Sequence, residues 1–243
     1  MVGFLGGLLL GVVFSVLGAG GGILAVPALT LGLRLSLNDA MGAGLAVVFS
    51  AALTAAVGHG RARRVDLRTV AIVAPTLALG AIAGARLNPL LPERLTAGLF
   101  ALVLLLATAS LFRARTEASA GPPSLKLLAG AGLGLGVLTG VLGVGGGFLL
   151  VPALTSLGRL PLARAVGTSS ALIAIGSLAG GVSALSSRPA LVPLVLPLAA
   201  GAIVGALLGV PLTGALPPQR LRAAFATLSV VVALGMTVKA VRG

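Results

Sequence analysis

The chain has very few charged residues for its length. Of its 243 residues, 9% are charged and 58% are hydrophobic, whereas a soluble domain carries about 25% charged residues. So little polar surface cannot cover a globule in water. Apolar runs of about 18 to 25 residues recur along the whole chain, which is the length that a membrane-spanning helix needs. The sequence therefore predicts an integral, multi-pass membrane protein.

Cysteine, tryptophan and tyrosine are absent, and acidic residues number four. Without cysteine there is no disulfide framework, no thiolate nucleophile and no cysteine metal site. The acids fall at segment ends or in loops, so no carboxylate is expected mid-span, where proton-coupled pumps usually place one. General acid–base pairs and metal clusters need residues that this chain does not bring together. We therefore expect no enzymatic activity, no metal and no cofactor.

Lysine and arginine number 17, which gives a net charge of +13. These cations occur singly or in short groups between apolar segments, not on clustered faces with aromatic platforms as in nucleic-acid modules. Cations so placed anchor helix ends in the headgroup layer and set the orientation of the protein. We expect the lipid bilayer as a partner and no nucleic acid, and a homo-oligomer stays open.

An interrupted apolar segment occurs twice, 125 residues apart. The run LGAGGGILAVPAL at 17–29 returns as LGVGGGFLLVPAL at 142–154. Residues 7–46 align with 132–171 without a gap, and 23 of the 40 positions are identical. The sequence therefore predicts two homologous repeats, at 1–115 and 125–243, joined by a polar linker at 116–124.

Each repeat offers four apolar segments, the first of which is broken by the glycines. We expect an all-α fold with about eight segments, at 3–33, 37–58, 68–88, 93–112, 126–158, 161–185, 190–212 and 218–240. If each broken segment crosses the bilayer, the repeats are parallel and the loop cations divide ten to seven; if each returns to its own side, the repeats are inverted and the division is eleven to six. The positive-inside rule does not decide between these arrangements. Both place 61–64 and the linker on one side, taken as cytoplasmic.

Small residues recur at every fourth position in the first segment of each repeat. A spacing of four puts them on one helix face, where two backbones can approach closely. We favour tight helix packing over a pore-lining role for these residues, which are Gly3, Gly7, Gly11 and Ser15, and Gly132, Gly136 and Gly140.

The glycine triplets could hold an anion. Three consecutive glycines followed by a proline cannot lie inside one continuous helix, and a broken backbone in lipid is tolerated only where protein or water surrounds it. A short helix that starts after the break leaves its first N–H groups unpaired, and these groups and the helix dipole favour an anion. Paired breaks of this kind are typical of a transporter's binding site. The alternative is a tight packing turn. The candidate substrate-binding residues are Gly20, Gly21, Gly22, Ile23, Gly145, Gly146, Gly147 and Phe148.

Thr168, Ser169 and Ser170 complete these candidates. They open the second segment of the second repeat, and their counterparts at 43–45 carry no hydroxyl. Consecutive hydroxyls at a helix start can donate to an anion or cap the helix.

We expect structural roles for the charged residues Arg34, Arg159 and Asp39. Arg34 and Arg159 are the charged pair kept by the repeat, and each follows a predicted short helix. A cation there suits a helix C-terminus, so we favour dipole compensation or anchoring over substrate contact. Asp39 lies at the start of a span, where a carboxylate caps well.

At these residues the chain resembles the TauE/SafE family of sulfite-exporter and sulfonate-uptake permeases. The resemblance is carried by the doubled LGxGGGxxxVPxL motif at 17–29 and 142–154, followed by 40–42 and 165–170. It implies a permease of the bacterial or archaeal cytoplasmic membrane for small sulfur-containing anions such as sulfite. We expect alternating access, with one repeat moving against the other. A gated anion channel and a non-transporting membrane scaffold or assembly protein are the alternatives.

Overall fold

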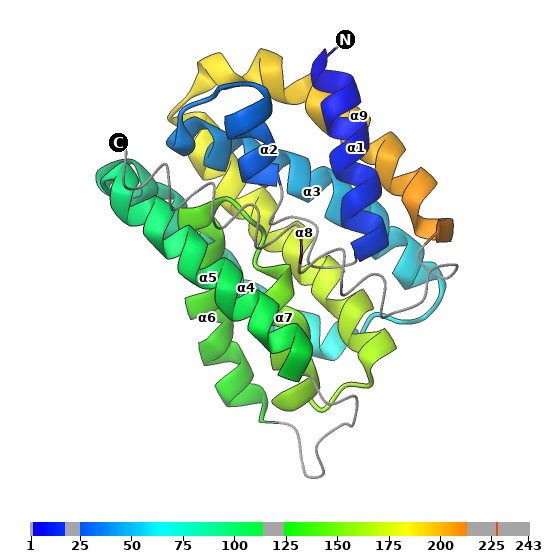
Figure 1. Cartoon of the computed structure of the whole chain (residues 1–243). Helices are drawn as coiled ribbons and strands as arrows, with labels where there is room; N and C mark the ends of the chain where they lie inside the picture. Colours follow the sequence, from blue (N-terminus) through cyan, green and yellow to red (C-terminus); the bar gives the residue numbers. More distant parts are fainter. Residues whose placement is uncertain (1, 18–24, 114–123, 213–226, 228–243) are drawn as a thin grey trace.

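The structure is a computed structural model, and it describes residues 2–17, 25–113, 124–212 and 227. Within those residues all regular structure is helical, and no strand occurs (Figure 1). The helices are α1 (Val2–Leu17), α2 (Ala25–Gly32), α3 (Leu37–Arg61), α4 (Leu67–Leu87), α5 (Glu93–Arg113), α6 (Leu125–Leu142), α7 (Gly147–Ser156), α8 (Leu162–Ser186) and α9 (Val192–Leu212), with 3₁₀ turns at Asn88–Leu90 and Pro189–Leu191.

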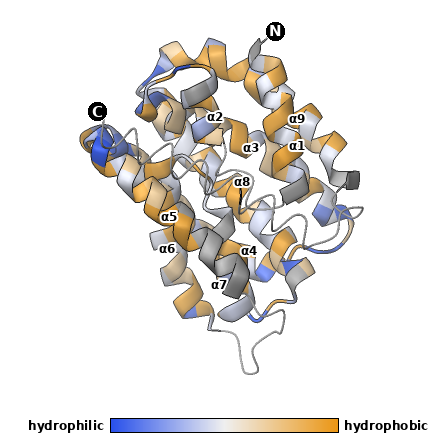
Figure 2. Ribbon diagram, viewed as in Figure 1, coloured by the Kyte–Doolittle hydropathy of each residue, from blue (hydrophilic) through white to orange (hydrophobic). Residues whose placement is uncertain are grey.

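Five helices in the described part of the chain are long and apolar enough to cross a membrane. Most of the helical ribbon is coloured hydrophobic in Figure 2, and many large apolar residues of these helices are exposed. Leu79 and Leu196, for example, are each 64% exposed, which suits lipid and not water. The all-α prediction is thereby confirmed within the described residues, and the candidate spans agree with a multi-pass protein. The count of about eight segments stays a prediction, because the segment at 218–240 lies outside the described residues. The five candidate spans are Leu37–Arg61, Leu67–Leu90, Leu125–Leu142, Ala163–Ser186 and Pro189–Gly209.

Corresponding helices in the two halves of the chain have equal lengths and the same offset as the two glycine motifs. α3 and α8 each have 25 residues, and α4 and α9 each have 21. The members of each pair begin 125 positions apart, which is the offset between the two motifs.

The long helices α3 and α8 pack against each other in opposite directions. The start of α3 meets the end of α8, since a Cβ added to Gly42 would lie 3.6 Å from the Cβ of Ala184. The start of α8 meets the end of α3, since a Cβ on Gly167 would lie 2.5 Å from the carbonyl oxygen of Arg64. We name these two ends of the pair the Asp39 end and the Asp66 end, after the acid at each.

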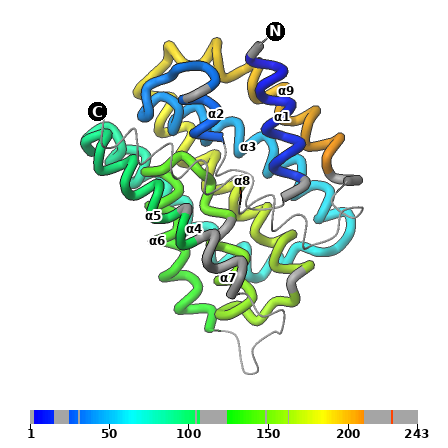
Figure 3. Tube along the Cα trace, viewed as in Figure 1, coloured from blue at the N-terminus to red at the C-terminus, as the bar shows by residue number. Residues whose placement is uncertain are grey.

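Backbone-to-backbone packing joins α1 to α9 and α6 to α4. A Cβ on Gly11 would overlap the carbonyl oxygen of Ala202, and a Cβ on Gly136 would overlap that of Leu77. Contacts of this kind need glycine because no side chain fits between the helices. The predicted packing role of the four-residue spacing is confirmed at these positions, and Figure 3 shows α1 and α9 lying side by side although they are far apart in sequence.

The helices α6 and α7 form a hairpin that returns to the end where it began. The amide N–H of Ser124, just before α6, donates to the carbonyl of Leu157, just after α7, at 2.9 Å. Near the other end of α6, the Asn88 side-chain amide donates to the Val141 carbonyl at 2.8 Å. Asn88 follows α4, which begins beside Asp66 and therefore ends toward the Asp39 end. The start of α6 and the end of α7 thus lie at the Asp66 end, and the turn between them lies toward the Asp39 end.

Candidate functional site

The turn between α6 and α7 depends on glycine at three positions. Gly143, Gly145 and Gly146 have φ values of +67°, +73° and +62°, a region that residues with a side chain rarely adopt. Gly143 closes α6 through an N–H bond to the Thr139 carbonyl at 2.9 Å, and Gly146 is the N-cap of α7. The predicted break is therefore confirmed in the second half of the chain, and α7 begins at Gly147, one residue before the expected start.

Gly145 lies against the middle of the α3–α8 pair. A Cβ on Gly145 would be 2.5 Å from Val48 Cγ1, 3.0 Å from Ile173 Cγ2 and 3.2 Å from Ser177 Oγ. Val48 and Ile173 are each the twelfth residue of a 25-residue helix. All residues from 141 to 147 are buried, so the interrupted backbone is enclosed by protein, as a break within a membrane must be.

The start of α7 offers hydrogen-bond donors at this depth. The amides of Leu149 and Leu150 both donate to the Gly146 carbonyl, at 3.1 and 3.2 Å. Helix geometry leaves the N–H groups of Gly147 and Phe148 without an intrahelical acceptor, and no side chain caps them from the Gly146 position. These amides lie at the positive end of the helix dipole, which favours a negative charge.

Ser177 on α8 is the polar side chain that the structure adds to this site. It is 0% exposed, and its hydroxyl has no hydrogen-bond partner. A buried hydroxyl without a partner is unfavourable, so its place beside Gly145 calls for an explanation. The sequence analysis missed Ser177 because it stands alone within an apolar span. Its spacing of seven from Ser170, which puts both on one face of α8, could have indicated it.

The candidates Thr168, Ser169 and Ser170 lie nearer the Asp66 end. Thr168 Oγ1 accepts a hydrogen bond from the Asp66 N–H at 2.9 Å. The hydroxyls of Ser169 and Ser170 both donate to the Val166 carbonyl, at 2.9 and 3.0 Å. From Ser169 to Ser177 the helix advances about 12 Å, so these hydroxyls are not the ones that the structure brings to Gly145. Their substrate role stays a prediction.

The first glycine triplet flanks a corresponding gap between helices. α1 ends at Leu17 and α2 begins at Ala25. The candidates Gly20, Gly21, Gly22 and Ile23 lie between them, outside the described residues, and stay predictions.

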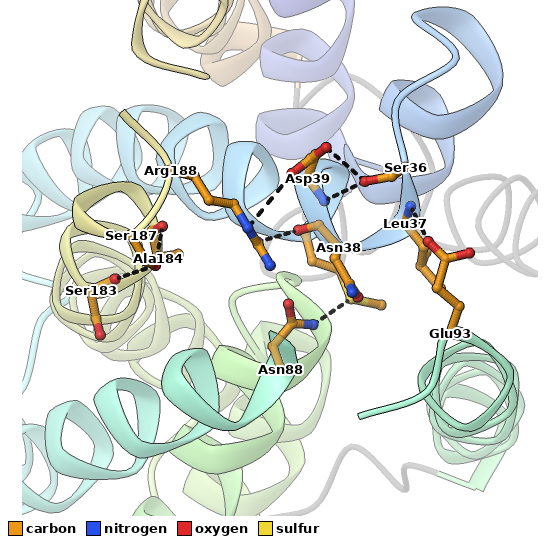
Figure 4. Close-up of polar contacts among 11 residues, drawn as sticks. Ser36, Leu37, Asn38, Asp39, Asn88, Glu93, Ser183, Ala184, Ser187 and Arg188 are labelled. Atoms are coloured by element: carbon orange, nitrogen blue, oxygen red, sulfur yellow. Dashed lines mark hydrogen bonds and ion pairs between the residues drawn. The ribbon is translucent and has the colours of Figure 1, made fainter. Parts of the chain in front are cut away.

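At the Asp39 end, a cluster of polar side chains joins the start of α3 to Arg188, which follows α8 (Figure 4). Ser36, not Asp39, is the N-cap of α3: its hydroxyl accepts from the Asp39 N–H at 3.2 Å and donates to Asp39 Oδ2 at 2.7 Å. This corrects the capping role expected for Asp39, because the third residue of a helix supplies the N–H that a cap receives. Asp39 Oδ1 instead pairs with Arg188 Nε at 3.6 Å, and Arg188 Nη1 donates to the Asn38 carbonyl at 2.7 Å.

A second ion pair lies at the Asp66 end. Arg164 Nη2 is 3.6 Å from Asp66 Oδ1, and the Thr69 hydroxyl donates to Asp66 Oδ2 at 2.6 Å. Both ion pairs join the predicted first repeat to the predicted second one. In the described part of the chain, one ion pair between the two predicted repeats thus lies at each end of the α3–α8 pair.

A buried break of this kind inside a bundle of candidate membrane-spanning helices is typical of membrane transporters as a class. The sequence model of the family described as Sulfite exporter TauE/SafE matches residues 3–236. The chain belongs to this family, and the predicted resemblance is confirmed.

Curated relatives carry transporter names. The chain is 27% identical to the probable membrane transporter protein YdhB of Bacillus subtilis, over 89% of this chain and 91% of that protein. It is 30% identical to a probable membrane transporter protein of Xylella fastidiosa, over 70% and 67%. It is 25% identical to the probable membrane transporter protein MJ0441 of Methanocaldococcus jannaschii, over 95% and 92%. No solved structure matches the chain significantly.

Proposed function

We propose that this transporter is a permease that moves small anions, sulfur-containing ones such as sulfite or sulfonates, across the cytoplasmic membrane of a prokaryote. The observation that carries the proposal is the buried α6–α7 break, whose helix start lies near the unpartnered hydroxyl of Ser177. An anion at this place would accept from that hydroxyl and from the free amides of Gly147 and Phe148. The family description names sulfite, which agrees with this donor chemistry.

The proposed site is neutral, and this suits a transported solute. The acids Asp39, Asp66 and Glu93 lie at helix ends or in loops, so none repels an anion at mid-depth. A buried arginine at the site would hold the anion through charge-assisted bonds, which are about twice as strong as neutral ones. Neutral donors bind more weakly and permit release on the far side.

We further propose that two inverted repeats open the site alternately to the two sides. This is supported by the opposite directions of α3 and α8, which occupy corresponding places in the sequence. The Asp39–Arg188 and Asp66–Arg164 ion pairs would then each close one end. A small rotation of one repeat against the other would break one pair and keep the other.

Liposomes that contain the purified protein test the proposal. A potential of 100 mV drives a singly charged anion by about 2.3 kcal/mol, so labelled sulfite should move toward the positive side faster than in empty liposomes. Ser177→Ala should slow this flux, whereas Ser50→Ala, which removes a hydroxyl bonded to the Ala46 carbonyl, should not. Sulfite added on the far side should accelerate uptake by counterflow in a carrier and not in a channel. No flux of sulfite or any sulfonate above empty liposomes would favour the scaffold alternative.

A further inference from the structure

Arg159 has two buried nitrogen atoms without a partner. The residue lies in the turn between α7 and α8, and its Nε and Nη1 are both buried and form no hydrogen bond. A guanidinium stays protonated at all accessible pH values and cannot lose its charge on burial. Burial of an unpaired charge is strongly unfavourable, and a partner of opposite charge normally accompanies it. The interface-anchoring role expected from the sequence leaves these buried nitrogens unexplained.

Among the residues that the structure describes, no acid is paired with Arg159. Arg159 lies at the Asp66 end, because the hairpin returns there at Leu157. Asp66, the acid that marks this end, is already bonded to Arg164 and to Thr69.

The turn that carries Arg159 is held in place by backbone bonds. The Gly158 N–H donates to the Ala153 carbonyl at 3.3 Å, and the Leu160 N–H donates to the Leu154 carbonyl at 3.1 Å. Arg159 itself has a left-handed backbone, with φ at +55°. Its side chain therefore projects from a fixed turn and not from a free loop end.

The counterpart Arg34 provides an internal comparison. It has nearly the same backbone, with φ at +54°, but it is exposed at the Asp39 end. The same turn thus presents one arginine to solvent and buries the nitrogens of the other. Turn geometry alone does not account for the two buried nitrogens of Arg159 that have no partner.

We propose that Arg159 binds an oxyanion group, either a free sulfite- or sulfate-like solute or the phosphate of an anionic lipid, at the Asp66 face. A planar guanidinium can hold two oxygens of such a group side by side. The site is separate from the α6–α7 break, because the ten-residue helix α7, about 15 Å long, lies between them. Other cations at this end, among them Arg61, Arg64 and Lys126, would raise the local concentration of anions. Transport is not required for this binding.

The experiment uses the full chain in phosphatidylcholine nanodiscs. Binding is measured by calorimetry and by the midpoint of thermal unfolding, first with sodium sulfite or sulfate against sodium chloride of equal ionic strength. The second arm replaces part of the lipid with phosphatidylglycerol and adds no oxyanion. A response in the first arm that Arg159→Gln reduces identifies a solute site at Arg159, and a response in the second arm that the same variant reduces identifies a lipid site; either supports the proposal. No response of the wild type in both arms would overturn it.

Variants assign the response to Arg159. Arg159→Gln should weaken binding at least tenfold, Arg159→Lys should weaken it less, and Arg34→Gln should leave it within twofold of the wild type. Equal binding by Arg159→Gln and the wild type would overturn the proposal. Without anions, Arg159→Gln should unfold no earlier than the wild type, because Nε and Nη1 have no hydrogen-bond partner to lose. Earlier unfolding of this variant would make the guanidinium structural and would also overturn the proposal. Ser177→Ala should keep the Arg159 response even where sulfite flux is lost, so this site and the transport site fail independently.

Discussion

Replacing Ser177 by alanine should raise the stability of the protein while it lowers the transport rate. In most buried serines the hydroxyl bonds to the protein, and its loss is neutral or destabilising. Ser177 is fully buried and its hydroxyl has no partner. An unpaired buried polar group costs about 1–3 kcal/mol, and this cost disappears in the alanine variant.

The size of the effect follows from two opposing contributions. Removing one oxygen atom leaves a small cavity, which costs roughly a few tenths of a kcal/mol. The net gain is about 1 kcal/mol, which corresponds to an increase in Tm of about 2–4 °C for a chain of this size. In the bound state the anion loses one hydrogen bond, and bonds to charged groups contribute about 1.5–3 kcal/mol. Anion binding should therefore weaken roughly ten- to a hundredfold.

The assay compares thermal unfolding in detergent with sulfite flux in liposomes for the same preparations. Ser50→Ala is the matched control, because Ser50 is also a buried serine of the central pair and its hydroxyl donates to the Ala46 carbonyl at 3.0 Å. Because Ser50→Ala loses one hydrogen bond, worth about 1 kcal/mol, its Tm should stay unchanged or fall, with flux intact. A lower Tm for Ser177→Ala together with unchanged flux would refute the reasoning, since the hydroxyl would then have a structural partner and no ligand.

Two further predictions concern the ion pairs and the helix packing. Asp39→Asn and Asp66→Asn should favour opposite states of the transporter. A cysteine introduced by Ser177→Cys would be the sole thiol of the chain, and a membrane-impermeant thiol reagent should label it faster from one side in the first variant and from the other side in the second. Faster labelling from the same side in both variants would contradict alternating closure. Gly136→Ala should destabilise the protein by about 2 kcal/mol or more, because its Cβ would overlap a carbonyl of α4. Gly134→Ala on the same helix meets open space and should stabilise the protein by up to about 1 kcal/mol. Equal unfolding midpoints for the two variants would contradict the packing.

The backbone features of the site could be predicted from sequence because they depend on local chemistry. The requirement for positive φ at Gly145 and Gly146 is a property of the chain itself, and a run of glycines before a proline indicates it. The helix bounds, too, are fixed by apolar length. The four-residue spacing that includes Gly136 indicated a close crossing, although it did not name α4 as the partner.

The side-chain features could not be predicted because they depend on which helices meet. Asp39 and Arg188 lie 149 positions apart in the sequence, and their ion pair exists only because α3 and α8 are antiparallel neighbours. The same holds for Ser177, whose isolation is visible only when its neighbours are known. The sequence assigned Arg159 the role suited to an exposed cation, and burial is a property of the packed molecule.

The charges at the two ends of the α3–α8 pair lead to an expectation for the direction of transport when the positive-inside rule is applied to them. Described cations at the Asp66 end include Arg61, Arg63, Arg64, Arg68, Lys126, Arg159 and Arg164, with Asp66 as the acid, whereas the Asp39 end has Arg34, Arg86, Arg94 and Arg188 with Asp39 and Glu93. The positive-inside rule predicts that the more basic end faces the cytoplasm, and the α6–α7 hairpin would then open from the cytoplasmic side. The interior of the cell is electrically negative, so an anion that enters the site from the cytoplasm is driven outward by the membrane potential without a coupling ion. We therefore expect net export of the anion when the protein is studied under a physiological membrane potential, and net uptake under that potential would require a coupled cation.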